Sequence, residues 1–584
     1  MIKERLEAIR KLMAKENISA YIIPTSDYHQ SEYISEYFKC REYMSGFTGS
    51  AGTLVIGINE AALYTDGRYF IQATKELLGS GITLMKIGEE GVMDLLEYVE
   101  NLLKDGGCLG FDAKYIDANF GIEVAKKIDI KSIDLVSPIW NDRPAMPYSK
   151  AFVLEEKYAG ESVTSKLVKI REEMRKVDAK YHLVTSLCDI AWIYNIRAND
   201  VLHNPVLLAY TLITDDAAYL YTDESKLDFT IDGVTIRPYE SIYEDVKKLS
   251  GKVMADIDSI NYELYLGIDD LEARHNPSTI LKAVKNETEI KNLYKAHIKD
   301  GVAVTKFIYW LKKNVKSDIT EKMAAEHLEN LRKEQKGYIE PSFETISAYG
   351  ANAALMHYSI KDEVVLKNEG FLLVDSGGQY YEGTTDVTRT IALGVLNERM
   401  KECYTLVLKG MLSLSDAKFL YGCTGRNLDI LARGPLWQNA IDYKCGTGHG
   451  VGYLLNVHEG PNGFRYKKPK DEYYDCVIEE GMVSSNEPGV YFEDEFGIRI
   501  ENEIIAKKHI KNEYGQFMAF ETLTLVPFDL DAIDYSLLSK KEIDMINKYH
   551  KRVYDELSPF LLEEEKEWLL AMVDGEQGKW MNVL

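Results

Sequence analysis

The sequence has 584 residues, of which 69 are lysine or arginine and 93 are aspartate or glutamate, giving a formal charge of −24. With 46% hydrophobic and 28% charged residues, the composition is typical of a globular protein and excludes disordered and fibrous classes. An acidic surface repels phosphate groups, and the chain contains no basic run that would reverse this locally. We therefore expect neither nucleic acid nor membrane as a partner.

The first residues, MIKERLEAIRKLMAKE, predict an amphipathic helix rather than a signal peptide, because charges occur throughout the segment. No uncharged apolar run approaches the roughly 18 residues that a membrane span requires. The seven cysteines are scattered and include no CxxC pair. Together these features predict a cytoplasmic protein with reduced thiols.

A weak internal repeat occupies the N-terminal part of the chain. Residues 4–27 place apolar side chains at helical spacing ahead of the apolar segment AYIIP, and residues 165–189 repeat this arrangement 161 positions later. The apolar positions are Leu6, Ile9 and Met13 in the first copy and Leu167, Ile170 and Met174 in the second. AALYTDGRY (61–69) is likewise echoed by AAYLYTDESK (217–226), so that Asp66 answers Asp223. The repeat predicts two related α/β domains in tandem, with chance similarity as the alternative.

Two further segments suggest domain boundaries. NDRPAMPYSK (141–150) fits a surface linker, because Pro144 and Pro147 bar a regular helix. The segment 285–315 has the periodicity of a long amphipathic helix, and its buried face should contain Ile290, Leu293, Ala296, His297, Val304 and Ile308. We therefore predict domains at 1–148, 149–284 and 285–584. The third should mix helices with strands and end in helices used for packing or oligomer contacts.

Most of the chemically suggestive residues lie between 350 and 501. In VDSGGQYYEGTTDVTRT (374–390), two strand-like runs joined by a glycine-containing turn should bring Asp375 and Asp386 together. Two close carboxylates repel each other unless a cation neutralises them. Taken alone, aspartate beside glycine is more often turn chemistry than a metal site.

Two later segments contribute further polar side chains. CGTGHGVGYLLNVHEGP (445–461) crowds glycines around His449, which allows close backbone approach to a ligand, and His458 follows. One histidine in such a loop is more often structural. NEPGVYFEDEFGIRIENE (486–503) places Glu487 before a proline and puts Arg499 and Glu501 on one face of a predicted strand. Each of these charged residues, taken singly, fits a salt bridge equally well.

The five candidate ligands are more informative as a set. Two aspartates, one histidine and two glutamates form an oxygen-rich set that suits two divalent cations with bridging carboxylates. Such a pair holds a water or hydroxide as a nucleophile, so the set predicts metal-assisted hydrolysis. The glycine run lacks the GxGxxG register, and the chain has no GxxxxGK[ST], HExxH or GxSxG motif. Dinucleotide binding, nucleotide hydrolysis, thermolysin-type and serine esterase chemistry therefore lose their main support.

The sequence resembles the pita-bread metallopeptidases, in particular the three-domain Xaa-Pro aminopeptidases (aminopeptidase P), over its whole length. The motifs are SGFTGSAGTLVI, TDGRYFIQA, KNETEI, GANAALMHY, DSGGQYYEGTTDVTRT, GTGHGVGYLLNVHEGP, NEPGVY, GIRIENE and ETLTLVPFDLDAID. The last resembles the extension that separates these enzymes from prolidases and methionine aminopeptidases. The resemblance implies an α/β (α+β) architecture, in which two related creatinase-like α/β domains precede a pita-bread catalytic domain.

The resemblance also implies roles for individual residues. The metal ligands would be Asp375, Asp386, His449, Glu487 and Glu501, with Asp386 and Glu501 bridging the ions and Glu487 also acting as the general base. Among the substrate-binding residues would be His449, together with His357 and His458, which would also stabilise the oxyanion. Arg499 would orient a metal-bound carboxylate. Arg68 would contact substrate, with a surface salt bridge as the alternative.

The implied reaction is hydrolysis of the bond between an N-terminal residue and proline by a metal-bridging hydroxide. The resemblance implies two divalent ions, Mn²⁺ in the first place and Zn²⁺ or Co²⁺ otherwise, and a homodimer. The alternatives are a prolidase-like Xaa-Pro dipeptidase and a non-catalytic binding protein of the same fold. A nicotinamide-dependent oxidoreductase is a third possibility, which the glycine register disfavours.

One position departs from the family pattern. Where the family commonly has HGTGHG, this chain has Cys445 in place of the first histidine. The change leaves all five ligand positions filled but puts substrate preference in question. The cysteine is either a structural residue or a thiol that lines the active-site cleft.

Overall fold

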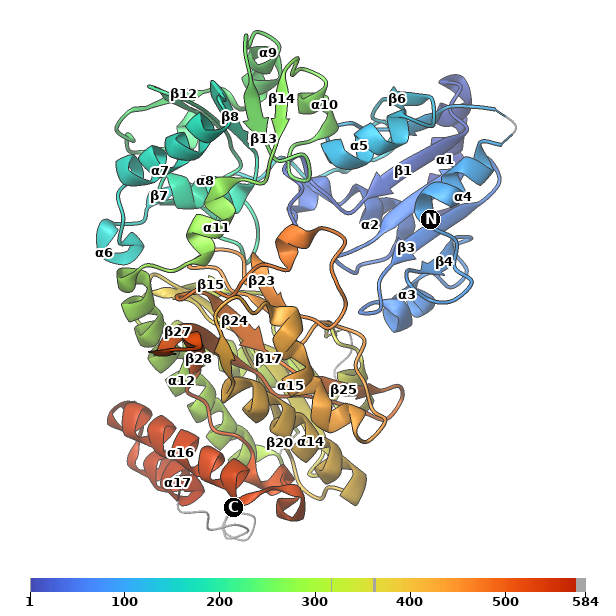
Figure 1. Ribbon diagram of the computed structural model, residues 1–584. Coiled ribbons are helices and arrows are strands. Elements are labelled where there is room, and N and C mark those ends of the chain that lie inside the picture. The colour runs from blue at the N-terminus through green and yellow to red at the C-terminus, as the bar shows by residue number, and fades with distance from the viewer. Residues whose placement is uncertain (1, 105, 317, 361–363, 574–584) are drawn as a thin grey trace. The chain divides into compact units, whose positions relative to one another are not determined.

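The computed structural model describes residues 2–104, 106–316, 318–360 and 364–573. Of these, 2–156 and 161–279 form one compact unit, and 157–160 and 280–573 form another (Figure 1). Among the described helices, none combines the length and the apolar character that crossing a bilayer requires.

The first unit contains two six-stranded mixed sheets with the same strand order. The first sheet runs β4 (Thr83–Lys86), β3 (Ala61–Thr65), β2 (Thr53–Gly57), β1 (Ala20–Pro24), β5 (Leu109–Phe111), β6 (Ile130–Ser132). The second runs β12 (Val234–Arg237), β11 (Ala218–Tyr221), β10 (Tyr210–Thr214), β8 (Tyr181–Val184), β13 (Val253–Ala255), β14 (Leu271–Ala273). Each pairing in one sheet has a counterpart of the same direction in the other. The predicted repeat is therefore confirmed at the level of topology.

The helices that precede the central strands β1 and β8 explain why the repeat was visible in the sequence. Helix α1 (Ile2–Lys15) buries Leu6, Ile9 and Met13, and helix α7 (Val163–Lys176) buries Leu167, Ile170 and Met174. The remaining helices of the unit are α2 (Cys40–Ser45), α3 (Phe70–Glu76), α4 (Leu95–Leu102), α5 (Ala118–Ala125), α8 (Leu187–Ile193), α9 (Ile242–Val246) and α10 (Tyr262–Tyr265). A two-stranded pair joins β7 (Phe152–Val153) to β9 (Ile196–Arg197).

Two short helices, α6 (Glu156–Ala159) and α11 (Pro277–Ala283), lie where the chain passes between the units. Residues 157–160 belong to the second unit by their contacts. Asn286 donates from Nδ2 to the carbonyl of Ala159 at 2.8 Å, and Asn292 donates to the carbonyl of Lys157 at 3.0 Å.

The long helix predicted over 285–315 is present as α12 (Glu287–Asn314). Asn286 caps it, and Glu289 completes a capping box, which fixes the start of the helix. Of the six residues predicted on its inner face, all but the half-buried Ile290 are buried. One core cluster joins α12 and α13 (Glu321–Lys333) to β17 (Phe371–Ser376), β20 (Val387–Ala392), α16 (Lys540–Leu557) and α17 (Glu563–Val573).

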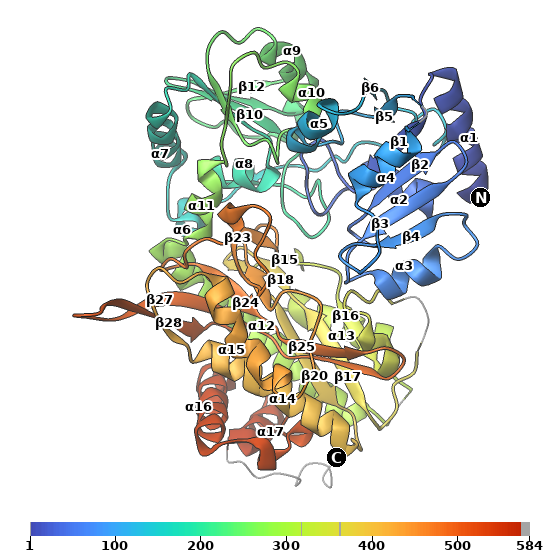
Figure 2. The ribbon, with the colours of Figure 1, turned by 45° about the vertical axis from the view of Figure 1, so that its right-hand side comes forward.

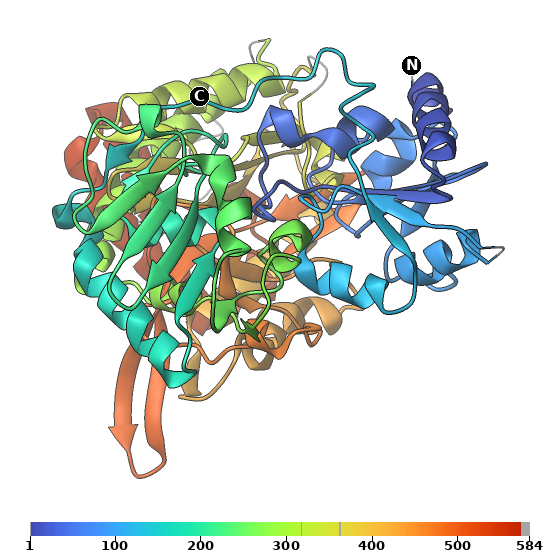
Figure 3. The same cartoon turned by 90° about the horizontal axis from the view of Figure 1, so that it is seen from above.

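The strands of the second unit form several sheets around the candidate site. One orders β16 (Ile346–Tyr349), β17 and β20, and another orders β15 (Tyr338–Pro341), β18 (Gly378–Tyr380) and β19 (Gly383–Thr384). The third orders β21 (Lys418–Leu420), β28 (Gly515–Thr522), β27 (Asn502–Asn512), β24 (Val483–Asn486), β22 (Gly448–Gly450) and β23 (Glu459–Phe464). A hairpin pairs β25 (Gly489–Phe492) with β26 (Phe496–Arg499), and α14 (Glu398–Ser415) and α15 (Gly425–Trp437) complete the unit. Figure 2 and Figure 3 show the β27–β28 hairpin extending away from the rest of its sheet.

Two local predictions need correction. The runs that carry Asp375 and Asp386 are not joined by a simple turn, because β18 and β19 intervene and pair in a separate sheet. Glu501 does not lie on the same strand as Arg499, since β26 ends at Arg499 and β27 begins at Asn502. Both differences reflect pairing with distant segments, which a local alternation pattern cannot register.

Candidate metal centre

Five side chains predicted as ligands arise from five different places in the second unit. Asp375 lies on β17, Asp386 directly before β20, His449 on β22, Glu487 between β24 and β25, and Glu501 between β26 and β27. Asp386, His449 and Glu501 offer ligand atoms that all lie within 4.8 Å of one another.

Contacts among the other members extend this cluster. The Nε2 atom of His449 lies 3.5 Å from Oδ2 of Asp386 and 3.2 Å from Oε1 of Glu487. Asp375 is placed by register, because β17 and β20 pair antiparallel with Asp375 opposite Thr388, two residues beyond Asp386. The sheet thus brings two aspartates that are eleven positions apart in sequence to one end of the same strand pair.

The glycines beside His449 have a packing role. A Cβ on Gly448 would stand 2.0 Å from the carbonyl oxygen of Ser485, and one on Gly450 would stand 2.2 Å from that of Glu459. Strand β22 therefore fits between β23 and β24 only because it lacks these side chains. The glycines therefore serve to position His449, and this packing explains them without a nucleotide-binding role.

The site contains buried oxygen atoms that the protein does not satisfy. Oδ1 of Asp375, Oδ1 of Asp386 and Oε1 of Glu501 have no hydrogen-bond partner in the described part of the chain. A buried carboxylate oxygen without a donor is costly in free energy, and a divalent cation removes that cost by coordination. The residues present therefore fit a two-cation centre.

The pKa values of the carboxylates also indicate a site for cations. Burial raises the pKa values of Asp386 and Glu501 well above their ordinary range, and neighbouring carboxylates raise them further. Burial also raises the pKa of Asp375, although Arg499 opposes it. Burial would raise the pKa of Glu487 as well, but the hydrogen bond and charge of His449 in its protonated form outweigh it and lower that pKa to about 2. Positive charge delivered to this cluster would stabilise all of its carboxylates.

The tautomer of His449 follows from its other nitrogen. Nδ1 lies 2.9 Å from the carbonyl oxygen of Gly450, which only accepts, so Nδ1 carries a hydrogen. In neutral imidazole this leaves the lone pair on Nε2, which faces the carboxylates of Asp386 and Glu487. This is the arrangement that a metal-binding histidine requires.

Arg499 contacts this cluster directly. Its Nη2 donates to Oδ2 of Asp375 at 2.6 Å, and its Nε donates to Oγ1 of Thr388 at 3.2 Å. Thr388 in turn donates to Oε2 of Glu501 at 2.7 Å. Arg499 and Thr388 therefore hold one oxygen of Asp375 and one of Glu501, which leaves the other oxygen of each carboxylate for a cation.

The remaining predicted residues have the following places. The rings of His449 and His458 lie 4.4 Å apart between centroids. His357 follows Met356, whose carbonyl lies 3.5 Å from Nη2 of Arg499. Arg68 lies in the first unit, where Nε and Nη2 donate to the two carboxylate oxygens of Asp66 at 2.9 and 2.8 Å.

Several residues that contact the candidate ligands or Arg499 were not predicted from the sequence. They are Thr388, Ser485, Tyr491 and Glu503. Ser485 donates from Oγ to Oε1 of Glu487 at 2.9 Å, and the hydroxyl of Tyr491 accepts from Nη1 of Arg499 at 2.7 Å. Thr388, Tyr491 and Glu503 lie inside or beside the motifs quoted above, but their spacing carries no sign of these contacts.

Family models match almost the whole chain. Residues 291–508 match the model of metallopeptidase family M24, and residues 516–574 match that of the C-terminal region of the same family. Residues 5–144 and 142–289 each match a creatinase/prolidase N-terminal domain. The two N-terminal matches agree with the repeated sheet.

Full-length relatives carry consistent names. A probable Xaa-Pro aminopeptidase P of Paracoccidioides brasiliensis is 38% identical over 97% of this chain and 98% of its own length. Xaa-Pro aminopeptidase 1 of Dictyostelium discoideum is 40% identical over 96% of this chain and 94% of its own.

A solved structure covers the same extent. The X-prolyl aminopeptidase of Caenorhabditis elegans, described as a cytosolic enzyme with a di-nuclear active site, superimposes with a TM-score of 0.94 at 32% identity, covering 98% of this chain and 99% of that one. The predicted architecture, two creatinase-like α/β domains ahead of a pita-bread domain, is thereby confirmed. The chain belongs to metallopeptidase family M24, among the members that carry two creatinase/prolidase N-terminal domains.

Proposed function

We propose that this protein is a metal-dependent aminopeptidase that hydrolyses the bond between an N-terminal residue and proline. The observation that carries the proposal is the cluster of buried carboxylates, three of whose oxygens have no hydrogen-bond partner in the described residues, beside the Nε2 atom of His449. Full-length similarity to proteins named Xaa-Pro aminopeptidases supports the substrate class.

The ligands we propose are Asp375, Asp386, His449, Glu487 and Glu501. Two bound divalent cations would supply an activated water and polarise the scissile carbonyl. We assign the general base to Glu487, which takes a proton from the water and passes it to the leaving nitrogen. The Glu487 side chain keeps 21% of its surface exposed, against 12% for Asp375 and 5% for Asp386, so it is the most accessible of these three carboxylates.

Three histidines and one arginine complete the proposed machinery. His449 and His458 lie ring to ring. His357 and His458 would donate hydrogen bonds that position the peptide and stabilise the oxyanion, and the metal ligand His449 would also contact the substrate. Arg499 would hold Asp375 in its liganding orientation. We retain Arg68 as a candidate substrate contact, although its guanidinium is already paired with Asp66.

Proline in the second position changes the chemistry of the peptide bond that is cleaved. A bond preceding proline is a tertiary amide without an N–H, so a peptidase that requires this donor recognises it poorly. A site that binds the free N-terminal amine and accepts the proline ring overcomes this difficulty. Such a site would release one residue and leave a peptide that begins with proline.

The second candidate is a prolidase-like dipeptidase, because prolidases share the fold. The prolidase of Pyrococcus horikoshii aligns with 99% of its own length but only 63% of this chain, at 26% identity and a TM-score of 0.51. The additional length favours the aminopeptidase. A non-catalytic member of the family would be expected to lack ligands, and all five positions are filled.

We further propose Mn²⁺ as the native metal, with Zn²⁺ or Co²⁺ as alternatives, since this ligand set accepts all three. We also propose a cytoplasmic homodimer that acts on peptides with proline in second position. The division into domains at 1–148, 149–284 and 285–584 is part of the proposal. The edges of the family models support it, and its last residues, 574–584, lie outside the described part of the chain.

The test is release of the N-terminal residue from Xaa-Pro-Yaa, Xaa-Ala-Yaa and Xaa-Pro peptides by metal-stripped protein, before and after addition of Mn²⁺, Co²⁺ or Zn²⁺. Metal-restored cleavage of Xaa-Pro-Yaa alone is expected. A Glu487→Gln variant should lose turnover, which assigns the activity to this site. Preference for the dipeptide would move the assignment to prolidase. No cleavage with any metal would contradict the proposal that this protein is a peptidase.

A further inference from the structure

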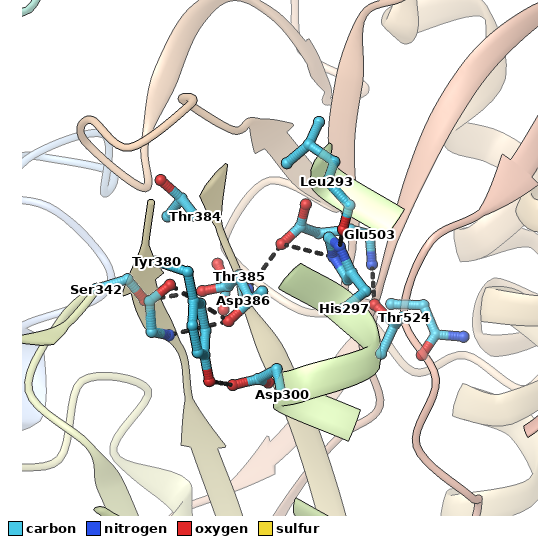
Figure 4. Close-up of polar contacts among 12 residues, drawn as sticks. Leu293, His297, Asp300, Ser342, Tyr380, Thr384, Thr385, Asp386, Glu503 and Thr524 are labelled. Carbon is cyan, nitrogen blue, oxygen red and sulfur yellow. Dashed lines mark hydrogen bonds and ion pairs between the residues drawn. The ribbon is translucent and has the colours of Figure 1, made fainter. Parts of the chain in front are cut away.

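Glu503 lies two residues beyond the candidate ligand Glu501 and contacts a different ligand. Its Oε1 accepts the backbone N–H of Asp386 at 2.7 Å, as Figure 4 shows. The two residues are 117 positions apart in the chain. Glu503 is fully buried, and its own N–H donates to Oγ1 of Thr524 at 2.8 Å, which fixes the start of its side chain.

His297 of α12 faces the same carboxylate. Its Nε2 lies 3.3 Å from Oε1 of Glu503, and its Nδ1 lies 2.8 Å from the carbonyl oxygen of Leu293 (Figure 4). Because that carbonyl only accepts, Nδ1 is a donor, and the ring is held with Nε2 toward Glu503. The imidazole keeps only 2% of its surface exposed. Nε2 carries a hydrogen only in the imidazolium form, and in that form His297 makes an ion pair with the same oxygen of Glu503 that accepts from Asp386.

The peptide group before Asp386 is held at both ends. Its N–H donates to Glu503, and its carbonyl, that of Thr385, accepts from Oγ of Ser342 at 2.8 Å. A peptide group is planar, so two hydrogen bonds on opposite edges fix its orientation. The plane includes the Cα atom of Asp386, so the two hydrogen bonds fix the point from which its side chain starts. Asp386 itself lies outside regular structure, between β19 and β20, where sheet pairing does not supply this constraint.

The energetics argue against a merely structural role. A buried carboxylate costs free energy that an apolar side chain of similar size would not, and Oε2 of Glu503 has no hydrogen-bond partner in the described residues. Packing alone would therefore favour a hydrocarbon side chain at this position. Groups that orient the ligands of a metal site are found despite this free-energy cost, because metal binding depends on the ligand geometry that they impose.

We propose that Glu503 and His297 are positioning residues, which fix the Thr385–Asp386 peptide group and so aim the Asp386 carboxylate at the cations. The inference rests on the proposed metal centre and deepens it. The expected consequence is on metal affinity, because Asp386 is one of the proposed metal ligands.

The test compares metal binding by four variants of the full-length protein. Glu503→Ala removes the acceptor, Glu503→Gln keeps an acceptor without the charge, and His297→Gln removes the ion-pair partner. Asp300→Asn is the matched control, because Asp300 lies on the same helix, one turn later, and is buried in an ion pair with Arg332 (Nε–Oδ1 2.7 Å) and a hydrogen bond from Tyr380 at 2.9 Å. No ligand proposed here contacts Asp300 in the described part of the chain.

Three quantities are measured. They are the Co²⁺ affinity, determined by competition with a chelator, the visible absorption spectrum of bound Co²⁺, and the melting temperature in the presence of chelator. Glu503→Ala should bind Co²⁺ about 10 to 100-fold more weakly and show altered bands. Glu503→Gln should recover most of that loss, and His297→Gln should fall between the two. Asp300→Asn should lower the melting temperature without changing affinity or bands.

Each other result overturns the inference in a recognisable way. If Glu503→Ala bound Co²⁺ as tightly as the wild type, or if Asp300→Asn lost as much Co²⁺ affinity, Glu503 and His297 would have only a structural role. Should Glu503→Ala not fold, His297→Gln decides, because unchanged affinity and bands there would contradict the proposal. Failure of the wild-type protein to bind two ions would instead overturn the metal centre itself.

Discussion

Arg499 donates from Nη2 to Oδ2 of Asp375 across 2.6 Å, while Oδ1 of the same carboxylate has no hydrogen-bond partner in the described residues. The guanidinium is held in turn, because its Nη1 donates to the hydroxyl of Tyr491 and its Nε to Oγ1 of Thr388. One oxygen of Asp375 is thus held by the Arg499 guanidinium, and the other is left for a metal ion.

Replacing Arg499 should therefore weaken the centre without removing a ligand. In Arg499→Lys the charge stays, but an ammonium group cannot make the same directed contacts with Asp375, Tyr491 and Thr388. We expect the kcat/KM for Xaa-Pro-Yaa peptides to fall about 10 to 100-fold, with a matching loss of metal affinity. Arg399→Lys is the control, because Arg399 pairs with Glu495 at the surface, where the two side chains are 49% and 50% exposed. Full activity in Arg499→Lys would contradict this role.

Gly448 should tolerate no side chain. A Cβ there would meet the backbone oxygen of Ser485 at 2.0 Å, so Gly448→Ala must push β22 away from β24 and displace His449. We expect a loss of about 1 to 3 kcal/mol in the free energy of unfolding, together with weaker metal binding. Gly446→Ala is the graded control, because its Cβ would stand 3.2 Å from the nearest atom, the carbonyl oxygen of Phe464. Denaturant titration should rank the two, and equal stability would refute the packing argument.

His550 should make the protein less stable in mild acid. Its Nε2 accepts the N–H of Phe528 at 3.0 Å, and burial lowers its pKa to about 4. The folded state therefore resists protonation that the unfolded chain accepts near pH 6.5. Stability from this group is complete above about pH 6.5 and declines as the pH falls toward 4, by about 2 kcal/mol between pH 7 and 5.

The measurement is the free energy of unfolding at pH 7 and pH 5 for wild type and His550→Gln. Glutamine retains an acceptor for the Phe528 N–H but does not titrate, so the difference between the two proteins isolates the histidine. The same pH dependence in both would show that other groups cause the acid sensitivity.

Cys445 should react slowly as a nucleophile. Burial raises the pKa of its thiol to about 12, and the charge of Glu487 contributes, so the thiolate is scarce at neutral pH. We expect iodoacetamide at pH 7.5 to label the half-buried Cys445 far more slowly in the folded protein than after denaturation, as peptide mass spectrometry would reveal. Rapid labelling with loss of turnover would indicate an open thiol in the cleft. Substrate profiles of Cys445→His then test whether this position influences specificity.

The parts of the fold that follow from local periodicity could be predicted from sequence. The buried faces of α1, α7 and α12 repeat every three to four residues, and the capping box at Asn286 is itself a local signal. The insertion of β18 and β19 between β17 and β20 escaped prediction, because strand pairing depends on distant partners.

The same division applies to the candidate site. The five proposed ligands stand out because acidic and histidine residues crowd into glycine-rich motifs. Thr388 and Glu503 do not stand out, since their roles arise only when β20 and the start of β27 are brought together. Thr388 reaches Glu501 across 113 positions, and Glu503 reaches Asp386 across 117. No pattern within a single segment encodes such contacts.

The short segment 157–160 has a practical consequence for dissecting this protein. The chain leaves the first unit at residue 157, returns to it at 161 and leaves again at 280, so no single cut separates the two units cleanly. A recombinant fragment that begins at 285 would lose the carbonyls of Lys157 and Ala159, the acceptors of Asn292 and Asn286 at the head of α12. Because His297 lies on that helix, trimming the chain there would loosen a support of the metal centre. Expression of the catalytic part alone should retain residues 157–160, grafted ahead of residue 280 through a short flexible linker.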